Sequence, residues 1–196
     1  MKITIRHGTD DDIPSLREVE LSAAALFSTI PSLAWIASSS SSMDISTLQS
    51  FASSKHLWVA ATNDTPVGFA CGETKDNCFY IAEISVHADW QRQGIARRLL
   101  AEVEAQVRGE GFGSLSLTTY RDVDWNDRFY RKLGFVEVDP VEEGLREHCA
   151  ELEKEAGDGH DVAIRTSTVT DAVHPYGFRR FETSWRCSRP GIASCR

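Results

Sequence analysis

Cys78-Phe-Tyr-Ile-Ala-Glu-Ile-Ser-Val-His87 has the composition of a β-strand, and the turn Gln91-Arg-Gln-Gly-Ile-Ala96 leads from it directly into a helix. Three glycines between 109 and 113 end that helix, because glycine tolerates the left-handed dihedral angles of a helix exit. A second strand (114–119), a short helix (125–133) and Gly134-Phe135 complete the stretch 80–135, around which the chain is organised. The first helix is predicted from apolar residues that recur on one face, at Ile95, Leu99, Leu100, Val103 and Val107.

The turn between this strand and this helix is a predicted anion site. A helix that begins just after a strand directs unbonded backbone N–H groups, and the positive end of its dipole, at one spot. Gly94 and the small Ala96 leave room for a phosphate to approach, and the arginines at 92, 97 and 98 add positive charge. An ordinary tight turn uses the same glycine, so this feature alone does not distinguish an anion site from such a turn. The residues expected to surround the anion are Gln91, Arg92, Gln93, Gly94, Ile95, Ala96 and Arg97.

A second motif follows at the spacing of a known family. The pattern Gln-x-x-Gly-x-Ala at 91–96 precedes a helix and a strand, and Phe129-Tyr-Arg-Lys-Leu-Gly-Phe135 follows them. In order and spacing these motifs resemble the GCN5-related N-acetyltransferases (GNAT family), over roughly residues 3–165. Trp125-Asn126, opening the helix before Phe129-Tyr130, is similar to one branch of that family. The resemblance implies an α/β (α+β) fold of the acyl-CoA N-acyltransferase type. Its mixed, mostly antiparallel sheet of six to seven strands, flanked by helices, is expected to splay between 78–87 and 114–119 and admit acetyl-CoA.

The composition fits one intracellular domain. With 196 residues, 41% of them hydrophobic, the chain is long enough to bury one sizeable core. It has no run of eighteen apolar residues and no signal-like start, and its five cysteines show no C-x-x-C spacing. We therefore expect a cytoplasmic protein with reduced thiols. The net charge of −8 argues against a nucleic-acid partner, which would need a basic surface. A monomer and a homodimer remain open.

The other elements are predicted from periodicity and turn residues. They are a strand at 3–6, a helix at 13–27 capped by Asp11 or Asp12, a short helix at 44–52, a hairpin at 57–62 and 66–74, and strands at 135–138 and 161–165. A loop is expected before residue 44, and the charged segment 142–155 has helical spacing. The acetyltransferase domain is expected to span 1–165. Residues 166–196, where arginines alternate with aromatics, are expected to be disordered or a packing arm, with RNA binding as the alternative.

Three residues are candidates for contact with the acceptor. Glu20 resembles the family position at which the first helix borders the acceptor site, although an ordinary solvated glutamate is the simpler explanation. Phe27 and Trp35 flank a region that covers the acceptor pocket in the family and varies with substrate. Both aromatics are also compatible with a plain core.

Acetyl transfer from a thioester to an amine needs a base. A primary alkylamine with a pKa near 10.4 is only about one part in a thousand neutral at pH 7, so the bound ammonium must lose a proton. Glu83 is the candidate base. It lies on the strand 78–87 and, by the period of two, shares a face with Ser85 and His87. The neutral imidazole of His87, or a water molecule, is the alternative.

The departing thiolate needs an acid, and Tyr130 is the candidate because it matches the family's tyrosine. The alternative is a core aromatic, beside the apolar stripe that we expect from Trp125, Phe129 and Leu133. The resemblance further implies that the backbone of Ile84, Ser85 and Val86 pairs with the pantetheine arm of the cofactor.

Asn126 is a candidate cofactor contact that departs from the commoner family pattern. That pattern has asparagine seven residues before the tyrosine, where this chain has Val123.

No other chemistry has support in the sequence. The six histidines show no paired ligand spacing, and there is no G-x-x-x-x-G-K-[ST] loop, so no metal is expected. The resemblance implies an acetyl-CoA-dependent N-acetyltransferase that acts directly on a small primary amine. Acetylation of a peptide or protein amino group is one alternative, and a non-enzymatic module that binds acyl-CoA is another. The presence of both Glu83 and Tyr130 favours an enzyme, since a binding module needs only the turn.

Overall fold

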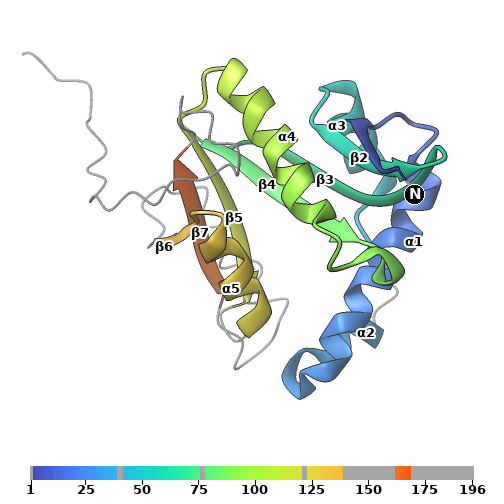
Figure 1. The fold of residues 1–196 in the computed structure, drawn as a ribbon, viewed down its shortest axis with the longest axis vertical. Coiled ribbons are helices and arrows are strands. Elements are labelled where there is room, and N and C mark those ends of the chain that lie inside the picture. Colours follow the sequence, from blue (N-terminus) through green and yellow to red (C-terminus); the bar gives the residue numbers. More distant parts are fainter. Residues whose placement is uncertain (1, 39–41, 76–77, 121–122, 139–161, 169–196) are drawn as a thin grey trace, which may run out of the picture.

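The structure is a computed structural model that describes residues 2–38, 42–75, 78–120, 123–138 and 162–168 (Figure 1). In chain order its elements are β1 (Thr4–His7), α1 (Ile13–Ala24), the 3-10 turns η1 (Ala25–Thr29) and η2 (Pro31–Leu33), α2 (Ala34–Ser38), α3 (Ile45–Ser53), β2 (Leu57–Thr62), β3 (Thr65–Lys75), β4 (Cys78–Val86), η3 (Ala88–Trp90), α4 (Ile95–Gly109), β5 (Ser114–Tyr120), α5 (Asp124–Lys132), β6 (Val136–Val138) and β7 (Val162–Thr168).

Most of these elements lie where the sequence predicts them, with three differences. The helix predicted at 13–27 ends as an α-helix at Ala24, and the 3-10 turn η1 follows it. The loop expected before residue 44 was wrong in part, because Pro31 occupies the first turn of η2 and α2 follows directly. Proline is favoured there because its fixed φ suits a helix start. The last strand also runs three residues past Arg165, the expected domain boundary. The charged segment 142–155 and the extension beyond 168 lie outside the described residues.

The seven described strands form one sheet in the order β1-β2-β3-β4-β5-β7-β6. All neighbouring strands pair antiparallel except β4 and β5, which are parallel. The mixed, mostly antiparallel α/β fold is therefore confirmed. Helix α4 packs on one face of the sheet, and α1 and α3 pack on the other (Figure 1).

Two apolar layers hold the centre of the sheet. Helix α4 buries the five positions that its periodicity predicts, none more than 2% exposed: Ile95, Leu99, Leu100, Val103 and Val107. On the opposite face, Leu16 and Val19 of α1 pack with Leu48 of α3 against β2 and β3. Burying one such side chain is worth about 1.5–3 kcal/mol. The central strands are thus packed on both faces, and this packing fixes the positions of the residues at the ends of these strands.

Asp12 stands at the predicted N-cap of α1, but its carboxylate does not cap the helix. It accepts hydrogen bonds from the Arg6 guanidinium (2.7 Å to each oxygen) and from the Thr9 N–H (2.9 Å). The backbone of Asp12 is helical, with φ −77° and ψ −30°, whereas a capping residue is usually extended. The carboxylate therefore ties β1 to the start of α1.

Strands β4 and β5 pair over only three residues. Residues 79–81 of β4 face 115–117 of β5, and no later pair joins the two strands in the described structure. Figure 1 shows the strands starting together and then running apart. We call the two diverging arms, Glu83–Val86 of β4 and Thr118–Tyr120 of β5, the β4–β5 fork. Its arms expose backbone groups that a further extended chain could pair with.

A β-bulge lies at the point where the fork opens. Cys71 of β3 pairs with Glu83, but the next residue, Gly72, pairs with Ile81, so Ala82 is an extra residue in β4. A bulge bends its strand and increases its twist. Gly72 is needed opposite it, because a Cβ at that position would lie 2.3 Å from the Tyr80 carbonyl oxygen. The bulge thus turns β4 away from β5.

Candidate active site

The turn before α4 has the backbone geometry of an anion site. Arg92 and Gly94 both adopt positive φ, of 59° and 77°. The Arg98 N–H bonds to the Gly94 carbonyl (3.1 Å) and opens the helical ladder, so the N–H groups just before it have no acceptor within the helix. A Cβ on Gly94 would meet nothing within 4 Å. With the positive end of the helix dipole behind it, this open space can accept a phosphate group.

Side chains anchor this turn to the sheet. The Gln91 amide donates to the Val86 carbonyl (3.0 Å), which fixes the turn against the end of β4. The Arg98 guanidinium donates to the Ile3 carbonyl beside β1 (2.9 Å), so that arginine is engaged away from the expected anion. Arg92 and Arg97 are exposed beside the turn. Of the predicted arginines, Arg98 is thus turned away from the expected anion, and Arg92 and Arg97 lie at the surface beside it.

Glu83 lies on the first arm of the fork, facing α1 and α3. The Ser85 hydroxyl donates to a Glu83 carboxylate oxygen (2.7 Å), so the two side chains share a face as predicted. Burial raises the pKa of Glu83 above its ordinary value, and the hydrogen bonds from Ser85 and from the Ile84 N–H oppose that shift. A carboxylate with a raised pKa is a better proton acceptor near neutral pH.

Tyr130 projects from α5 and is only 7% exposed. Its ring packs edge-on against Phe129 and Phe135, with centroids 5.1 and 5.6 Å away. Burial, and then the negative charge of Glu83, raises the pKa of Tyr130 above its usual range. Glu83 and Tyr130 are therefore close enough to interact, although they come from distant parts of the chain. The phenol stays protonated at neutral pH and is a possible proton donor.

The apolar stripe of α5 differs from the predicted one. Tyr130 and Leu133 are buried together, whereas Trp125 is 37% exposed and lies outside the core clusters formed by the described residues. The expected stripe is confirmed at Phe129 and Leu133, which face the core. It was wrong for Trp125, which lies in the first turn of α5 and packs on Phe27, and Tyr130 is part of the buried face rather than beside it. Tyr130 thus has structural neighbours as well as a possible catalytic role.

Arg165, at the centre of β7, was not expected to bear on the site. It is 1% exposed and forms ion pairs with Asp127 of α5 (2.5 Å) and Glu137 of β6 (3.6 Å). Its positive charge opposes the rise in the pKa of Tyr130. Arg165 therefore fastens α5 to the sheet and reaches Tyr130 electrostatically. No sequence pattern predicts this role for Arg165, because nothing in the sequence of a short strand distinguishes a buried arginine from an exposed one.

Asn126 is held against the second arm of the fork. Its amide nitrogen donates to the Thr119 hydroxyl (2.9 Å). Val123, at the position where the commoner family pattern has asparagine, is fully buried. Contact between Asn126 and a cofactor stays a prediction, and the side chain lies beside the strand where such a contact would be made.

Glu20 of α1 is not the solvated helix residue of the simpler explanation. Both of its carboxylate oxygens accept from the Met43 N–H, at 3.1 and 3.0 Å. Burial and the nearby charge of Glu83 raise the pKa of Glu20 to about 7. Glu20 and Glu83 therefore lie near one another on the same side of the sheet.

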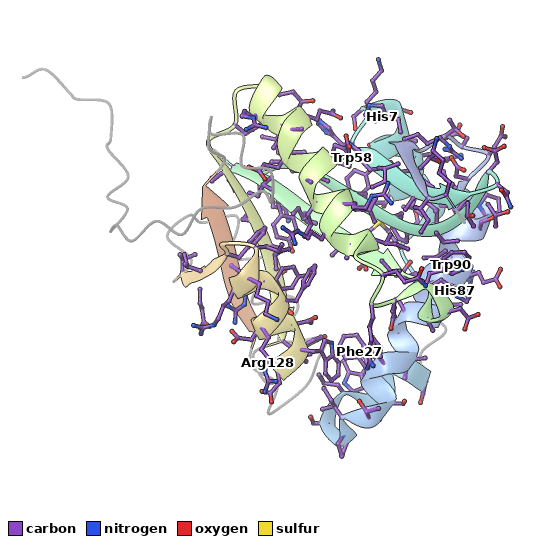
Figure 2. The ribbon with its side chains drawn as sticks, viewed as in Figure 1. His7, Phe27, Trp58, His87, Trp90 and Arg128 are labelled. Carbon is purple, nitrogen blue, oxygen red and sulfur yellow. The ribbon has the colours of Figure 1, made fainter. Side chains whose placement is uncertain are left out.

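Phe27 joins a group of aromatic rings that spans two parts of the molecule. Its centroid is 6.3 Å from that of Tyr120, at the end of β5, and 6.2 Å from that of Trp125. Figure 2 shows Phe27 directed from the segment after α1 toward α5. Trp35, by contrast, is 43% exposed on α2, and among the residues that the structure describes it belongs to none of the core clusters or aromatic pairs. The structure thus places Phe27, but not Trp35, beside the end of the β5 arm of the fork.

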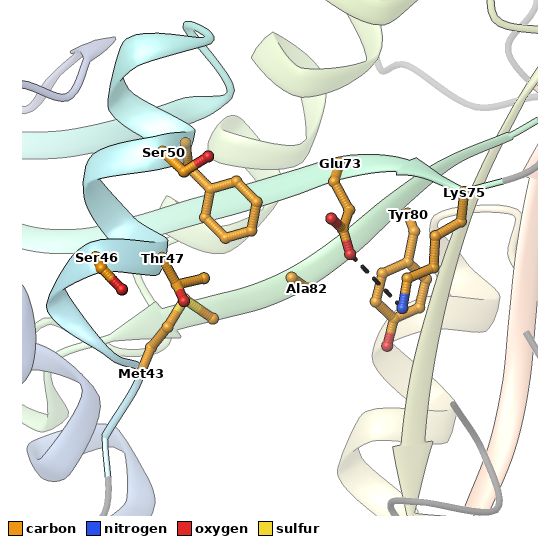
Figure 3. A pocket seen from close by; sticks show the side chains of 9 residues that line it. Met43, Ser46, Thr47, Ser50, Glu73, Lys75, Tyr80 and Ala82 are labelled. Atoms are coloured by element: carbon orange, nitrogen blue, oxygen red, sulfur yellow. Dashed lines mark ion pairs between the residues drawn. The ribbon is translucent and has the colours of Figure 1, made fainter. Parts of the chain in front are cut away.

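A groove of about 480 Å³ lies on the same face of the sheet, between α3 and the strands β3 and β4 (Figure 3). Its α3 wall carries the hydroxyl groups of Ser46, Thr47 and Ser50. The strand wall carries the Glu73–Lys75 ion pair (3.6 Å), with the Lys75 ammonium 4.6 Å above the Tyr80 ring. Ala82 and Met43 also line the groove, so it begins next to Glu83 and Glu20.

His87 occupies the corner after β4. Its Nδ1 accepts from the Asp89 N–H (3.3 Å) and lies 3.8 Å from the Asp89 carboxylate. These contacts give it a part in the η3 turn. Across the described ranges, no three His, Cys, Asp or Glu side chains are arranged to hold a metal ion, and no helix is both long and apolar enough to cross a membrane.

Comparison with known proteins identifies a family whose sequence and fold match this chain. The sequence model of the acetyltransferase (GNAT) family matches residues 25–135, which is more than half of the chain. The fold is similar to that of PaiA N-acetyltransferase from Thermoplasma acidophilum in complex with coenzyme A, with a TM-score of 0.63, 18% identity, and coverage of 86% of this chain and 99% of that one.

Two further solved structures share the fold. The ribosomal-protein-S18-alanine N-acetyltransferase from Escherichia coli has a TM-score of 0.62 and 19% identity, covering 90% and 100% of the two chains. YncA from Salmonella typhimurium, a putative acetyltransferase with its cofactor acetyl-CoA, has a TM-score of 0.61 and 16% identity, covering 89% and 98%. The family's sequence model covers more than half of the chain, and the forked sheet and the glycine turn before α4 agree with it. The chain therefore belongs to the GNAT family of acetyltransferases and is an acyltransferase.

Proposed function

We propose that the protein transfers the acetyl group of acetyl-CoA directly to a small primary amine. The observation that carries this proposal is the β4–β5 fork, with Glu83 on one of its arms and the buried phenol of Tyr130 within electrostatic reach of that carboxylate. A proton acceptor and a proton donor there are what a direct acyl transfer requires. Thiol release from acetyl-CoA in the presence of different amines tests it.

The cofactor would bind along the fork. Its pyrophosphate would lie on the turn Gln91–Ala96 and Arg97, where the helix begins and backbone N–H groups are available. The pantetheine arm would pair with the backbone of Ile84–Val86, which has no partner in β5, and Asn126 would contact it from the other arm. The coenzyme A and acetyl-CoA bound in similar structures support this choice of cofactor.

The reaction can be followed proton by proton. The acceptor arrives as an ammonium ion and gives one proton to Glu83, which later releases it to solvent. The neutral nitrogen attacks the thioester carbonyl, whose oxygen a backbone N–H of the fork can polarise. As the C–S bond breaks, Tyr130 gives its proton to the thiolate and regains one from the new amide nitrogen. The products are an acetylamide, coenzyme A and one free proton.

The acceptor would enter from the face of α1 and α3, where Glu20 and Phe27 border the fork. The groove beside α3 offers hydroxyl groups and one ion pair rather than a long apolar channel, which favours a small polar amine. A peptide amino group is the second candidate, because the Escherichia coli structure that shares the fold is named for acetylating a ribosomal protein.

Glu83→Gln tests the base. The variant keeps the shape and the Ser85 contact but cannot accept a proton. We expect a loss of kcat/KM for a reactive amine that shrinks as pH rises from about 6 to 9.5, because more amine is then already neutral. Glu102→Gln, on the exposed side of α4, is the matched control and should behave as wild type. An equal loss at every pH would indicate a positioning role, and no loss would assign the base to His87 or to water.

Truncation tests the extent of the catalytic domain. We expect a chain ending at Thr168 to turn over acetyl-CoA within a few fold of the full chain. Ending it at Arg165 removes the residues of β7 that pair with Ser114, Leu115 and Ser116, so that chain should unfold at a lower temperature. Thermal melting and thiol release on both chains give the result. A folded chain ending at 168 that has lost most of its activity would place residues beyond it in the site.

A further inference from the structure

Arg165 places a positive charge in the layer between the sheet and α5. It lies opposite Leu117 of β5 and opposite Glu137 of β6, and directly opposed residues of antiparallel strands point to the same face of a sheet. That face is the one covered by α4 and α5, because Leu117 belongs to the same core cluster as Tyr130 and the buried positions of α4 (Figure 1). Arg165 and Tyr130 therefore enter the same layer, one from the sheet and the other from the helix.

The ion pairs of Arg165 hold its guanidinium close to the turn of α5 that carries Tyr130. Its Nη2 lies 2.5 Å from the Asp127 carboxylate and 3.6 Å from that of Glu137. Asp127 precedes Tyr130 by three positions on α5, and residues at that spacing are neighbours on one face of a helix. The guanidinium is thus fixed within about one helical turn of the Tyr130 ring.

The pairing of this guanidinium is incomplete. Its Nε and Nη1 are buried, and neither has a hydrogen-bond partner among the described residues. A buried polar group without a partner costs folding stability. Asp127 also accepts from Arg131 (2.8 Å), so its single negative charge lies between two arginines. Glu137 is more distant, and its side chain is 35% exposed, where water weakens its effect. The positive charge of Arg165 is therefore only partly offset by its ion-pair partners.

The charge of Arg165 is opposite in sign to the charge that Tyr130 would acquire during the reaction. Among the described groups that shift the pKa of Tyr130, burial, Glu83 and Tyr80 raise it and Arg165 lowers it. In the proposed reaction Tyr130 becomes a phenolate once it has given its proton to the departing thiolate. That negative charge would form in a buried site already near Glu83. A fixed positive charge in the same layer lowers the free energy of this state.

We propose that Arg165 is a positioning residue for acetyl transfer, whose buried positive charge stabilises Tyr130 in the deprotonated form that follows proton donation to the thiolate. The proposal rests on the proposed function and assigns β7 a part in the reaction. No bond to Arg165 forms or breaks. The proton passes from the Tyr130 oxygen to the sulfur of coenzyme A, and the phenolate regains one from the new amide nitrogen. The guanidinium keeps all of its protons throughout.

Asp127→Asn and Arg165→Met separate the charge from the attachment of α5. Asp127→Asn removes the ion pair but leaves the guanidinium, so most of kcat should remain. Adding Arg165→Met removes the positive charge without leaving the Asp127 carboxylate unpaired, and kcat should then fall about three- to tenfold further. Acetyl-CoA affinity, measured by calorimetric titration, should not change, because Arg165 is buried. Arg128→Met, which breaks an exposed ion pair on the same helix, is the matched control and should behave as wild type.

A cycle with Tyr130→Phe shows whether the charge acts through the phenol. Without the hydroxyl there is no phenolate to stabilise, so adding Arg165→Met to Tyr130→Phe and Asp127→Asn should lower kcat by less than about twofold. Arg165→Lys, which keeps the charge, should keep kcat within about threefold of wild type. Thermal melting identifies any variant that does not fold. If the Arg165→Met proteins do not, a folded Arg165→Lys protein that loses as much kcat as Tyr130→Phe would still overturn the proposal.

The outcomes distinguish this inference from the proposed function. An equal loss from Arg165→Met with and without the Tyr130 hydroxyl, or a loss already complete in Asp127→Asn, would make Arg165 an anchor of α5 and overturn the proposal. No loss from Arg165→Met would overturn it as well. Each of these results would leave the acetyl transfer in place. The absence of turnover by wild type with any amine would instead remove the proposed function, and this inference with it.

Discussion

Gly94→Glu should abolish acetyl-CoA binding. The backbone of Gly94 has φ of 77°, and the space in front of its Cα is open. A glutamate side chain would enter the space where the pyrophosphate is expected and set a negative charge against it at the head of α4. Calorimetric titration of the folded variant with acetyl-CoA measures the effect.

Two other substitutions separate charge from backbone strain. Gly111→Glu places the same side chain at a residue with φ of 93°, also with nothing near its Cβ, but at the far end of α4. We expect it to bind acetyl-CoA normally. Gly94→Ala, which brings strain without charge, should weaken binding less than Gly94→Glu does. Unchanged affinity in Gly94→Glu would mean that the cofactor lies elsewhere.

Tyr130→Phe should lower kcat at least tenfold, a loss of about 1.4 kcal/mol or more of transition-state stabilisation. General acid assistance is typically worth about a hundred- to ten-thousandfold, and the variant removes only the donor. Because the pKa of Tyr130 lies above its usual range, the phenol stays protonated and the defect should be constant from about pH 6 to 9. Acetyl-CoA affinity should barely change, since Phe keeps the ring contacts with Phe129 and Phe135.

Tyr80→Phe is the matched control for this loss. Tyr80 is another buried phenol, and its hydroxyl is hydrogen-bonded to Thr118 across β4 and β5. Removing it should lower thermal stability and leave most of kcat. Wild-type kcat in Tyr130→Phe, measured where chemistry limits the rate, would exclude Tyr130 as the acid. A Tyr130→Phe protein that does not fold would favour the core-aromatic alternative.

The parts of the fold that sequence predicts well are those with strong local signals. The buried face of α4 follows from five apolar residues at helical spacing, and the turn before it from one glycine in the left-handed region. Strands β2 and β3 follow from their apolar runs on either side of Asn63-Asp64. In these segments, local preference and tertiary burial agree.

What the sequence does not predict depends on contacts between distant segments. The bulge at Ala82 has one trace in the sequence, the glycine at 72 opposite it, since an isolated glycine in a strand often marks a bulge. The exposure of Trp125 depends on Phe27, and the behaviour of Glu20 depends on Met43 and Glu83. No local pattern distinguishes a glutamate that faces water from one that faces another carboxylate.

Thiol release from acetyl-CoA, measured with a panel of acceptors, tests the central claim most directly. The panel should contain small primary alkylamines, arylamines of similar size, peptides with free amino groups and a reaction without acceptor, with the acetylated product identified by mass. We expect the small alkylamines to raise thiol release well above the rate without acceptor and to yield one acetylamide per thiol. Turnover with peptides alone would assign the acceptor to the peptide class, and tight acetyl-CoA binding without thiol release for any acceptor would contradict the proposed acetyl transfer.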